Sequence, residues 1–261
     1  MPDFSPSETC VFLAAHPDDE VFIAGTVRTL LRAGVRVQGV WCTSGDYFGQ
    51  GALREKEVHR AADILGLPES ARHLLRFPDL GLVRELERAA DRVAEIFADC
   101  RPGSVFCTAF EGGHPDHDCV NFLAVEACRR SGLTPDLYEY PLYNSAGPAR
   151  YWYWQINTFP RQDGELVYTP LDSDAIDCKY RMMKAYSSQW MYMIPARLAS
   201  SKSRLSVEGE RYLRVPLDRD HTIRPHPGTL HYERLFCAFM KIRFPDFRDA
   251  VKKCLHAAEV R

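Results

Sequence analysis

The stretch CVFLAAHPDDEV, residues 10–21, ends an apolar run with a histidine and three successive carboxylates, His16 and Asp18 to Glu20. Neighbouring carboxylates repel one another, and burying a charge is costly unless a partner neutralises it. Imidazole together with carboxylate favours a borderline divalent ion such as zinc, whereas calcium and magnesium prefer oxygen ligands. The stretch therefore predicts a metal site. The alternative is a plain helix start, where acids favour the first turn.

A second cluster of the same kind, EGGHPDHDC, occupies residues 111–119. Catalytic zinc usually has three protein ligands and one open position for water, and a spare carboxylate can accept the proton of that water. The alternative is a solvated turn before a helix. The side chains most naturally convergent on one metal are His16, Asp19, His114 and His117, with Asp18 and Asp116 beside them.

Strands and helices alternate through the first 145 residues, and this alternation predicts how the two clusters meet. It indicates an α/β fold with a doubly wound, mostly parallel, Rossmann-like sheet of order 3-2-1-4-5. The clusters follow the first and fourth strands, which are neighbours at the switch point where such sheets bind ligands. The expected strands are 9–15, 35–43, 72–77, 104–110 and 137–143, and the expected helices are 20–33, 53–65, 82–100 and 116–131.

The pattern changes after about residue 145, where aromatic residues, Pro and Gly predict a loop and a β-hairpin. A helix over 172–190, a turn-rich stretch over 207–228 and a helix over 229–255, interrupted by Pro245, should follow. We expect one domain over 1–261, with a core over 1–145. Residues 146–261 would form a hairpin and helix appendage that shapes the substrate site.

Composition narrows the function classes. Of 261 residues 46% are hydrophobic, as in ordinary globular proteins, and the net charge of −2 gives no electrostatic case for nucleic acid or an anionic membrane. The nine cysteines include no C-x-x-C pair, which argues against a zinc ribbon or a disulfide framework and favours a reducing compartment. We expect a cytoplasmic protein without a signal peptide or membrane span. Homo-oligomerisation stays open.

The two clusters, read as AAHPDDEVFIAGT and GGHPDH, resemble the PIG-L/LmbE-like family of zinc-dependent de-N-acetylases. LREKEVHRAADILG and LLRFPDLGL also agree with that family, so the resemblance covers about residues 10–130. It implies hydrolysis of an N-acyl group on an amino sugar or glycoside, with release of acetate and a free amine. The implied cofactor is one Zn²⁺ per chain, with Fe²⁺ or Co²⁺ as other divalent options.

Carried over residue by residue, the resemblance implies that His16, Asp19 and His117 bind the metal. Asp18 would be the general base, and His114 would be the acid or oxyanion stabiliser, polarised by Asp116. Arg54 and Asp79 would hold substrate hydroxyls or an anionic group. Taken alone, Arg54 could equally pair with a helix neighbour, Glu55 or Glu57, and Asp79 could be a turn residue.

The aromatic run Tyr151–Trp154 has two interpretations. Trp152 and Trp154 could form a platform for a sugar, or the run could pack in the core and hairpin. We expect the C-terminal histidines to be surface or core residues, with a role at the pocket rim as the alternative; they are His221, His226 and His231.

Two other functions use the same residues. A nucleotide-binding or non-catalytic α/β module should have a G-x-G-x-x-G after the first strand, where this chain has His16-Pro17-Asp18-Asp19. Two histidines and one carboxylate also describe a mononuclear non-haem iron site.

Overall fold

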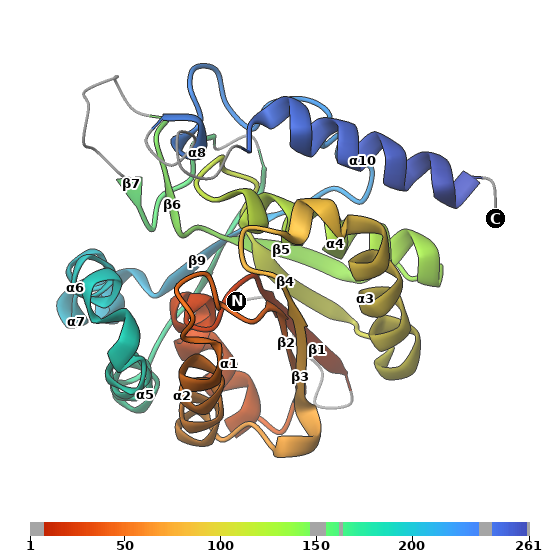
Figure 1. The fold of residues 1–261 in the computed structure, drawn as a ribbon. Coiled ribbons are helices and arrows are strands. Elements are labelled where there is room, and N and C mark those ends of the chain that lie inside the picture. Colours follow the sequence, from red (N-terminus) through yellow and green to blue (C-terminus); the bar gives the residue numbers. More distant parts are fainter. Residues whose placement is uncertain (1–7, 147–154, 162–163, 235–241, 260–261) are drawn as a thin grey trace.

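The computed structural model describes residues 8–146, 155–161, 164–234 and 242–259. A seven-stranded sheet of order β3-β2-β1-β4-β5-β9-β8 forms its centre (Figure 1). The predicted order 3-2-1-4-5 is confirmed, and β1 and β4 pair directly. The parallel strands are β1 (Thr9–Ala14), β2 (Arg36–Thr43), β3 (Arg72–Phe77), β4 (Ser104–Thr108) and β5 (Asp136–Tyr140).

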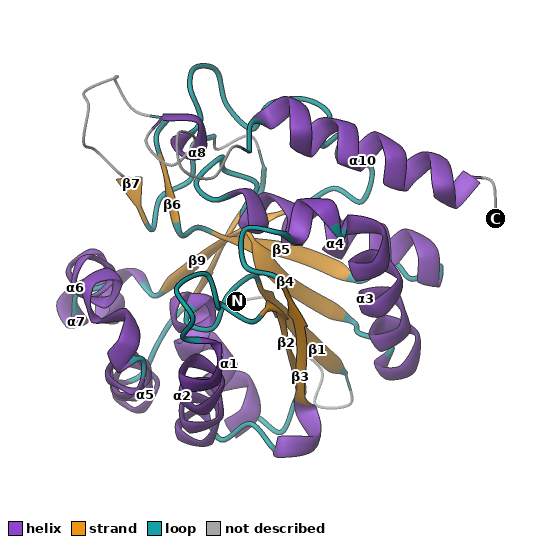
Figure 2. Ribbon diagram, viewed as in Figure 1, coloured by secondary structure: helices purple, strands orange, loops and turns teal. Residues whose placement is uncertain are grey.

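Helices cover both faces of this sheet (Figure 2). One layer contains α1 (Ala24–Arg32), α2 (Gly51–Leu65) and α5 (Ser173–Ala185). The other contains α3 (Leu86–Cys100), α4 (Pro115–Ser131) and α10 (Phe244–Glu259). Short 3₁₀ helices occur in the connections: η1 (Asp19–Ile23), η2 (Glu69–Ala71) and η3 (Leu82–Arg84).

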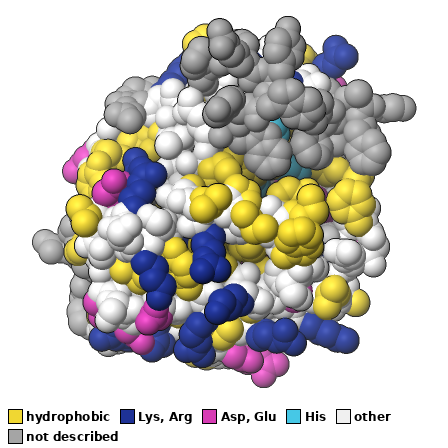
Figure 3. Space-filling view, turned by 90° about the vertical axis from the view of Figure 1, so that its left-hand side faces the viewer, with side chains coloured by type: hydrophobic (Ala, Val, Ile, Leu, Met, Phe, Trp, Pro, Cys, Tyr) yellow, Lys and Arg dark blue, Asp and Glu magenta, His cyan; other side chains and the backbone are white. Residues whose placement is uncertain are grey.

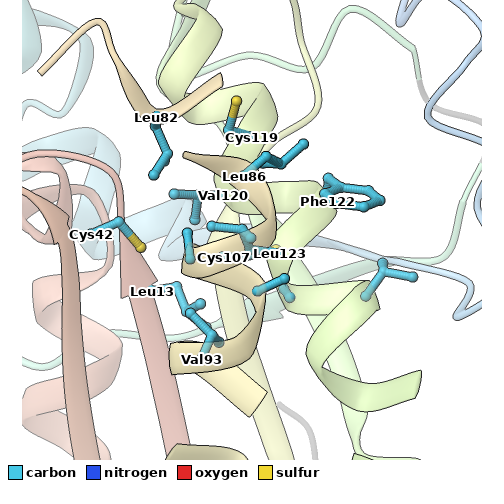
Figure 4. Packing of buried hydrophobic residues seen from close by; sticks show 14 of the residues in the cluster. Leu13, Cys42, Leu82, Leu86, Val93, Cys107, Cys119, Val120, Phe122 and Leu123 are labelled. Carbon is cyan, nitrogen blue, oxygen red and sulfur yellow. The ribbon is translucent and has the colours of Figure 1, made fainter. Parts of the chain in front are cut away.

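Strand β1 is buried on both faces, which explains its continuous apolar run. Successive side chains of a strand point to opposite faces, so Phe12 packs in the layer of α1 and α2, and Leu13 in the layer of α3 and α4. Figure 4 shows Leu13 beside Val93 of α3 and close to Leu123 of α4. The chain therefore leaves β1 in a fixed direction, toward the loop that carries His16.

The sheet continues beyond the predicted five strands. Strand β9 (Glu210–Arg214) lies antiparallel between β5 and β8 (Leu166–Thr169). The stretch that contains β9 looked turn-rich because the strand is short and charged, ERYLR. Its Glu210 is nevertheless buried, because it pairs with Lys179 of α5. A separate two-stranded sheet joins β6 (Tyr143–Asn144) and β7 (Gln155–Ile156).

The C-terminal helices differ from the predicted ones. Helix α5 ends at Ala185 and is followed by η4 (Ser187–Gln189), α6 (Trp190–Ala199) and α7 (Lys202–Glu208). The predicted helix over 229–255 corresponds to α8 (His231–Arg234) and to α10. Pro245 is the second residue of α10, a position that needs no intrahelical N–H, so it helps the helix to begin. Among the described helices, none is long and apolar enough to cross a membrane.

Candidate functional site

The loop after β1 holds His16, Asp18 and Asp19 in a strained turn. Asp18 has a φ of 114°, a conformation that a residue with a side chain rarely adopts. The carboxylate of Glu20 supports it by accepting the backbone N–H of Asp18 at 3.1 Å and the indole N–H of Trp41 at 3.0 Å. The hydroxyl of Tyr186 also donates to Glu20. The third acid of the motif is therefore a buried support for the first.

The loop after β4 carries the second cluster. His114 caps the N-terminus of α4, because its Nδ1 accepts the backbone N–H of Asp116 at 3.1 Å. Two buried acids hold the loop in place. Asp118 accepts the N–H groups of Glu111 and Gly112, each at 3.1 Å, and Glu111 accepts those of Leu142 and Tyr143 at 2.8 and 2.9 Å.

The two loops meet because β1 and β4 are adjacent. The Asp19 carboxylate lies between two imidazoles, with Oδ2 3.5 Å from His16 Nδ1 and Oδ1 3.3 Å from His117 Nε2. The other ring nitrogen of His16, Nε2, lies 3.2 Å from an oxygen of Asp79 and 3.3 Å from one of Asp116. His114 stacks edge-on to His16, with 4.5 Å between the ring centroids.

The electrostatics of this cluster follow from burial and proximity. Burial opposes the charge of His16, but the carboxylates of Asp79, Asp116 and Asp19 outweigh it and raise the pKa of His16 well above its usual value. Burial, with the charges of His16 and His117, lowers the pKa of His114 well below its usual value. The ring of His114 is therefore neutral, and since Nδ1 accepts a hydrogen bond, its proton is on Nε2.

Asp18 and Asp19 differ although they are adjacent. Burial raises the pKa of Asp18 to about 7, against the opposing charge of Arg54. Burial also acts on Asp19, but the neighbouring His117 and His16 overcome it and hold the pKa of Asp19 well below its usual value. Asp19 is thus a permanent carboxylate between two imidazoles, and Asp18 lies beside it, 2.8 Å from Nη2 of Arg54.

The cluster lies in a pocket of about 430 Å³. His16, Asp18, Asp19, His114 and His117 all line it. Its walls are mostly apolar and come from the β2–α2 loop, η4, α6 and β7; they include Tyr47, Phe48, Ile156, Trp190, Met191 and Tyr192. A polar, charged floor under apolar walls is typical of a small-molecule site.

Comparisons with known proteins agree with this site. Residues 11–128 match the family model described as PIG-L, GlcNAc-PI de-N-acetylase, and both clusters fall within that range. These residues are therefore similar to the PIG-L family. It is 32% identical over 133 residues to the N-acetylglucosaminyl-phosphatidylinositol de-N-acetylase of Bos taurus, covering 48% of this chain and 52% of the relative.

A second curated relative is the diacetylchitobiose deacetylase of Thermococcus kodakarensis. The two are 31% identical over 146 residues, which cover 50% of this chain and 52% of that protein. The chain thus spans about half the length of these curated relatives. Both relatives are deacetylases by name.

Solved structures extend the likeness beyond the PIG-L match. A conserved protein of Thermus thermophilus, TT1542, is 26% identical, with a TM-score of 0.58 over 80% of this chain and 94% of that one. A deacetylase of the teicoplanin biosynthesis pathway has a TM-score of 0.61 over 79% of this chain and 97% of that one. At 15% identity the latter is a likeness of fold.

The residues predicted to bind substrate differ in where the structure places them. Arg54 is buried and donates to the Asp18 carboxylate and to the carbonyl oxygens of Gly45 and Pro17. Asp79 lines the pocket and lies 3.2 Å from His16. Trp152 and Trp154 lie outside the described residues, so their predicted role as a sugar platform stays a prediction.

Asp116 reaches the site differently from the expectation. Its carboxylate accepts the backbone N–H of Leu80 at 2.7 Å and lies against His16, whereas only its backbone N–H contacts His114. At the start of a helix the backbone N–H groups point outward without intrahelical partners, which makes this contact with the capping imidazole possible.

Of the three C-terminal histidines, His231 lines the pocket, close to Tyr143. His221 and His226 are buried away from the lining, against Asn121 and the carbonyl of Pro227. Two supports of the site, Glu111 and Asp118, were not predicted from the sequence. Their signal was present, because these two further acids flank the histidines within the same motif, EGGHPDHDC.

Proposed function

We propose that this protein is a metal-dependent hydrolase that removes an N-acetyl group from an amino sugar or glycoside. Water would add to the amide carbonyl, the C–N bond would break, and acetate and a free amine would leave. Three features support this: the matched family, the two deacetylases among the relatives, and the convergence of imidazoles and carboxylates on the floor of a small-molecule pocket.

We propose His16, Asp19 and His117 as the metal ligands. The Asp19 carboxylate lies between the two imidazoles, with Oδ2 3.5 Å from His16 Nδ1 and Oδ1 3.3 Å from His117 Nε2, and imidazole with carboxylate suits zinc. A bound zinc would polarise the amide carbonyl and lower the pKa of a water molecule. Asp79 and Asp116 would then orient His16 through its other ring nitrogen.

Two different triads have ligand atoms that all lie within 4.8 Å of one another: His16, His114 and His117, and His16, Asp79 and Asp116. Metal analysis of single variants separates them. Under our proposal Asp19→Ala loses the metal, and His114→Ala keeps the wild-type amount. The reverse result would move the site to the three histidines.

Asp18 is the proposed proton acceptor. It lines the pocket beside Asp19, and its carboxylate is oriented by the guanidinium of Arg54 at 2.8 Å. The Arg54 side chain is itself fixed by backbone carbonyls on both sides, so it holds Asp18 in one position. General base catalysis typically contributes 10²–10⁴-fold to rate.

His114 is the proposed oxyanion stabiliser. Its neutral ring presents Nε2–H as a donor, since Nδ1 is occupied by the N–H of Asp116. A neutral donor can hold the developing negative charge on the carbonyl oxygen by a hydrogen bond.

The observation that carries the proposal is Asp18 standing beside the three proposed ligands on the pocket floor. The experiment combines metal analysis with amine release from N-acetylglucosamine, N,N′-diacetylchitobiose and N-acetylated glycosides. Asp18→Asn should keep the metal and lose at least about 100-fold in kcat. Asp177→Asn, an exposed carboxylate on α5, is the matched control and should leave both unchanged. Full turnover in Asp18→Asn would refute the assignment.

The same experiment distinguishes the alternatives. A non-haem iron enzyme would consume oxygen and regain activity with Fe²⁺ alone. A binding module would release no amine with any metal. The loop after β1 also contains His16-Pro17-Asp18-Asp19 in place of phosphate-binding glycines, which favours the hydrolase.

A further inference from the structure

In one segment of the chain, every charged residue is Lys or Arg. Residues 178–207 contain six Lys or Arg and neither Asp nor Glu, although the chain as a whole has a net charge of −2. This segment runs from α5 through α6 and α7. The near-neutral total charge therefore does not describe how charge is distributed along this segment.

The same segment carries an exposed apolar helix face. Trp190, Ile194 and Leu198 recur every fourth residue of α6, so they form one stripe along it. They are 61%, 51% and 75% exposed, and Met191 beside them is 63% exposed. The opposite side of α6 is buried through Met193 and Ala196. Helix α6 is thus apolar on both sides, and its outer side has no described partner.

The stripe continues across the mouth of the pocket. Phe48, in the β2–α2 loop, is 75% exposed, and Tyr47 beside it is also exposed. Both line the pocket together with Trp190 and Met191. Large exposed apolar side chains therefore stand on two sides of the opening, a concentration that marks an interaction surface.

Basic side chains lie on α6 itself and on α5, which packs against it. Some cations of the segment are neutralised within the chain: Lys179 by Glu210, Lys202 by Asp177 and Arg204 by Glu208. Three others are exposed on α5 and α6: Arg181, Lys184 and Arg197. Figure 3 looks onto this side of the molecule and shows apolar side chains with Lys and Arg between them.

We propose that the outer face of α6, together with Tyr47 and Phe48, binds the surface of an anionic lipid bilayer. Aromatic and aliphatic side chains would enter the headgroup region, while Arg181, Lys184 and Arg197 contact anionic headgroups. A helix that is apolar on its outer side and bordered by cations is typical of proteins that lie on a membrane without crossing it. This proposal does not depend on the proposed deacetylation.

A second copy of the chain is the competing occupant, and charge disfavours it. A two-fold interface places the same patch on both partners, so it would bring the cations of the segment close to their own copies. An anionic bilayer complements both the apolar side chains and the cations. The pocket mouth would then open at the membrane surface.

The test is co-sedimentation of the full chain with vesicles. Vesicles of phosphatidylcholine with roughly 30% phosphatidylserine are compared with pure phosphatidylcholine vesicles. The wild-type protein should bind the anionic vesicles at least about tenfold better, and this preference should shrink as salt is raised. Trp190→Ser/Ile194→Ser/Leu198→Ser should weaken binding about tenfold or more, and so should Arg181→Gln/Lys184→Gln/Arg197→Gln.

Matched controls alter equally exposed residues elsewhere. Tyr168→Ser/Ile223→Ser removes exposed apolar side chains, and Arg243→Gln/Lys252→Gln/Lys253→Gln removes three exposed charges in or next to α10. Both should bind vesicles like the wild type, and circular dichroism checks that every variant is folded. Unchanged binding by the α6 variant overturns the proposal. So does a wild-type dimer, seen by light scattering, that ignores vesicles and dissociates in the α6 variant.

Discussion

Gly113 tests whether the loop before α4 is as tightly placed as the structure shows. A Cβ atom on Gly113 would lie 1.9 Å from the carbonyl oxygen of Tyr143. Real Cβ contacts essentially never fall below 3.0 Å, so Gly113→Ala must separate the two backbones by at least 1.1 Å. The opposing atom belongs to the backbone, so no side-chain rotation can relieve the contact. The displacement therefore reaches His114, the next residue.

The expected cost has two parts. Overpacking of this kind destabilises a protein by about 1–3 kcal/mol. A misplacement of about 1 Å in a catalytic constellation costs about 100-fold in rate. Gly113→Ala should therefore lower the free energy of unfolding modestly and amine release much more. Urea denaturation, metal content and kcat measured on the same preparation separate these effects.

Gly132→Ala is the matched control. Gly132 caps the other end of α4 with a φ of +66°, and a Cβ there would meet nothing within 4 Å. This variant should lose about 1 kcal/mol of stability, the strain of a left-handed alanine, and keep its turnover. If Gly113→Ala retained wild-type kcat, the close approach of residues 113 and 143, and the placement of His114 built on it, would be refuted.

Three further substitutions test the supports of the site. Glu20→Ala leaves the N–H groups of Asp18 and Trp41 without their acceptor. We therefore expect urea denaturation to show a free energy of unfolding lower by about 2–4 kcal/mol. The loss of kcat should be larger than in a surface variant such as Glu69→Ala. Burial raises the pKa of Glu111 to about 8 from 4.5. The folded state therefore holds a proton that the unfolded state releases, and stability should fall as pH rises from about 4.5 to 8, by at most ~1.4 kcal/mol per pH unit. Glu111→Gln should flatten this slope, and identical slopes in both proteins would contradict the raised pKa. Glu210→Ala removes the partner of buried Lys179 and the acceptor of two N–H groups of α1. We therefore expect the free energy of unfolding to fall by about 3–5 kcal/mol, which a lower thermal midpoint would show. A decrease below about 1 kcal/mol would show that Lys179 is hydrated.

Much of the fold could be predicted because the parallel core follows strong local rules. Continuous apolar runs such as Thr9–Ala14 are typical of strands covered on both faces, and alternating helices set their order. Because this strand order makes β1 and β4 neighbours, it also places the loops that contain His16 and His117 next to each other. The meeting of His16, Asp19 and His117 is therefore a consequence of topology.

The remainder depended on long-range contacts that leave little local trace. Strand β9 exists because β5 and β8 accept it as a neighbour, and its sequence alternates too weakly to show this. Likewise, the pairing of Arg54 with Asp18 joins α2 to the loop after β1, so no helix neighbour of Arg54 could reveal it. The proposed membrane-binding role of the outer face of α6 was missed for a different reason. The net charge of the whole chain does not show where individual charges lie.

The Glu20–Tyr186 hydrogen bond has a consequence for protein engineering. The family match ends at residue 128, yet a side chain far beyond that boundary donates to the acid that supports Asp18. Ser188 donates in the same way to Glu57 of α2. A chimaera that joins residues 11–128 to the C-terminal part of another protein would keep both His/Asp clusters but lose the hydrogen bond from Tyr186 to Glu20. Exchange of C-terminal segments between such proteins should therefore transfer the residue that contacts Glu20 together with Glu20 itself.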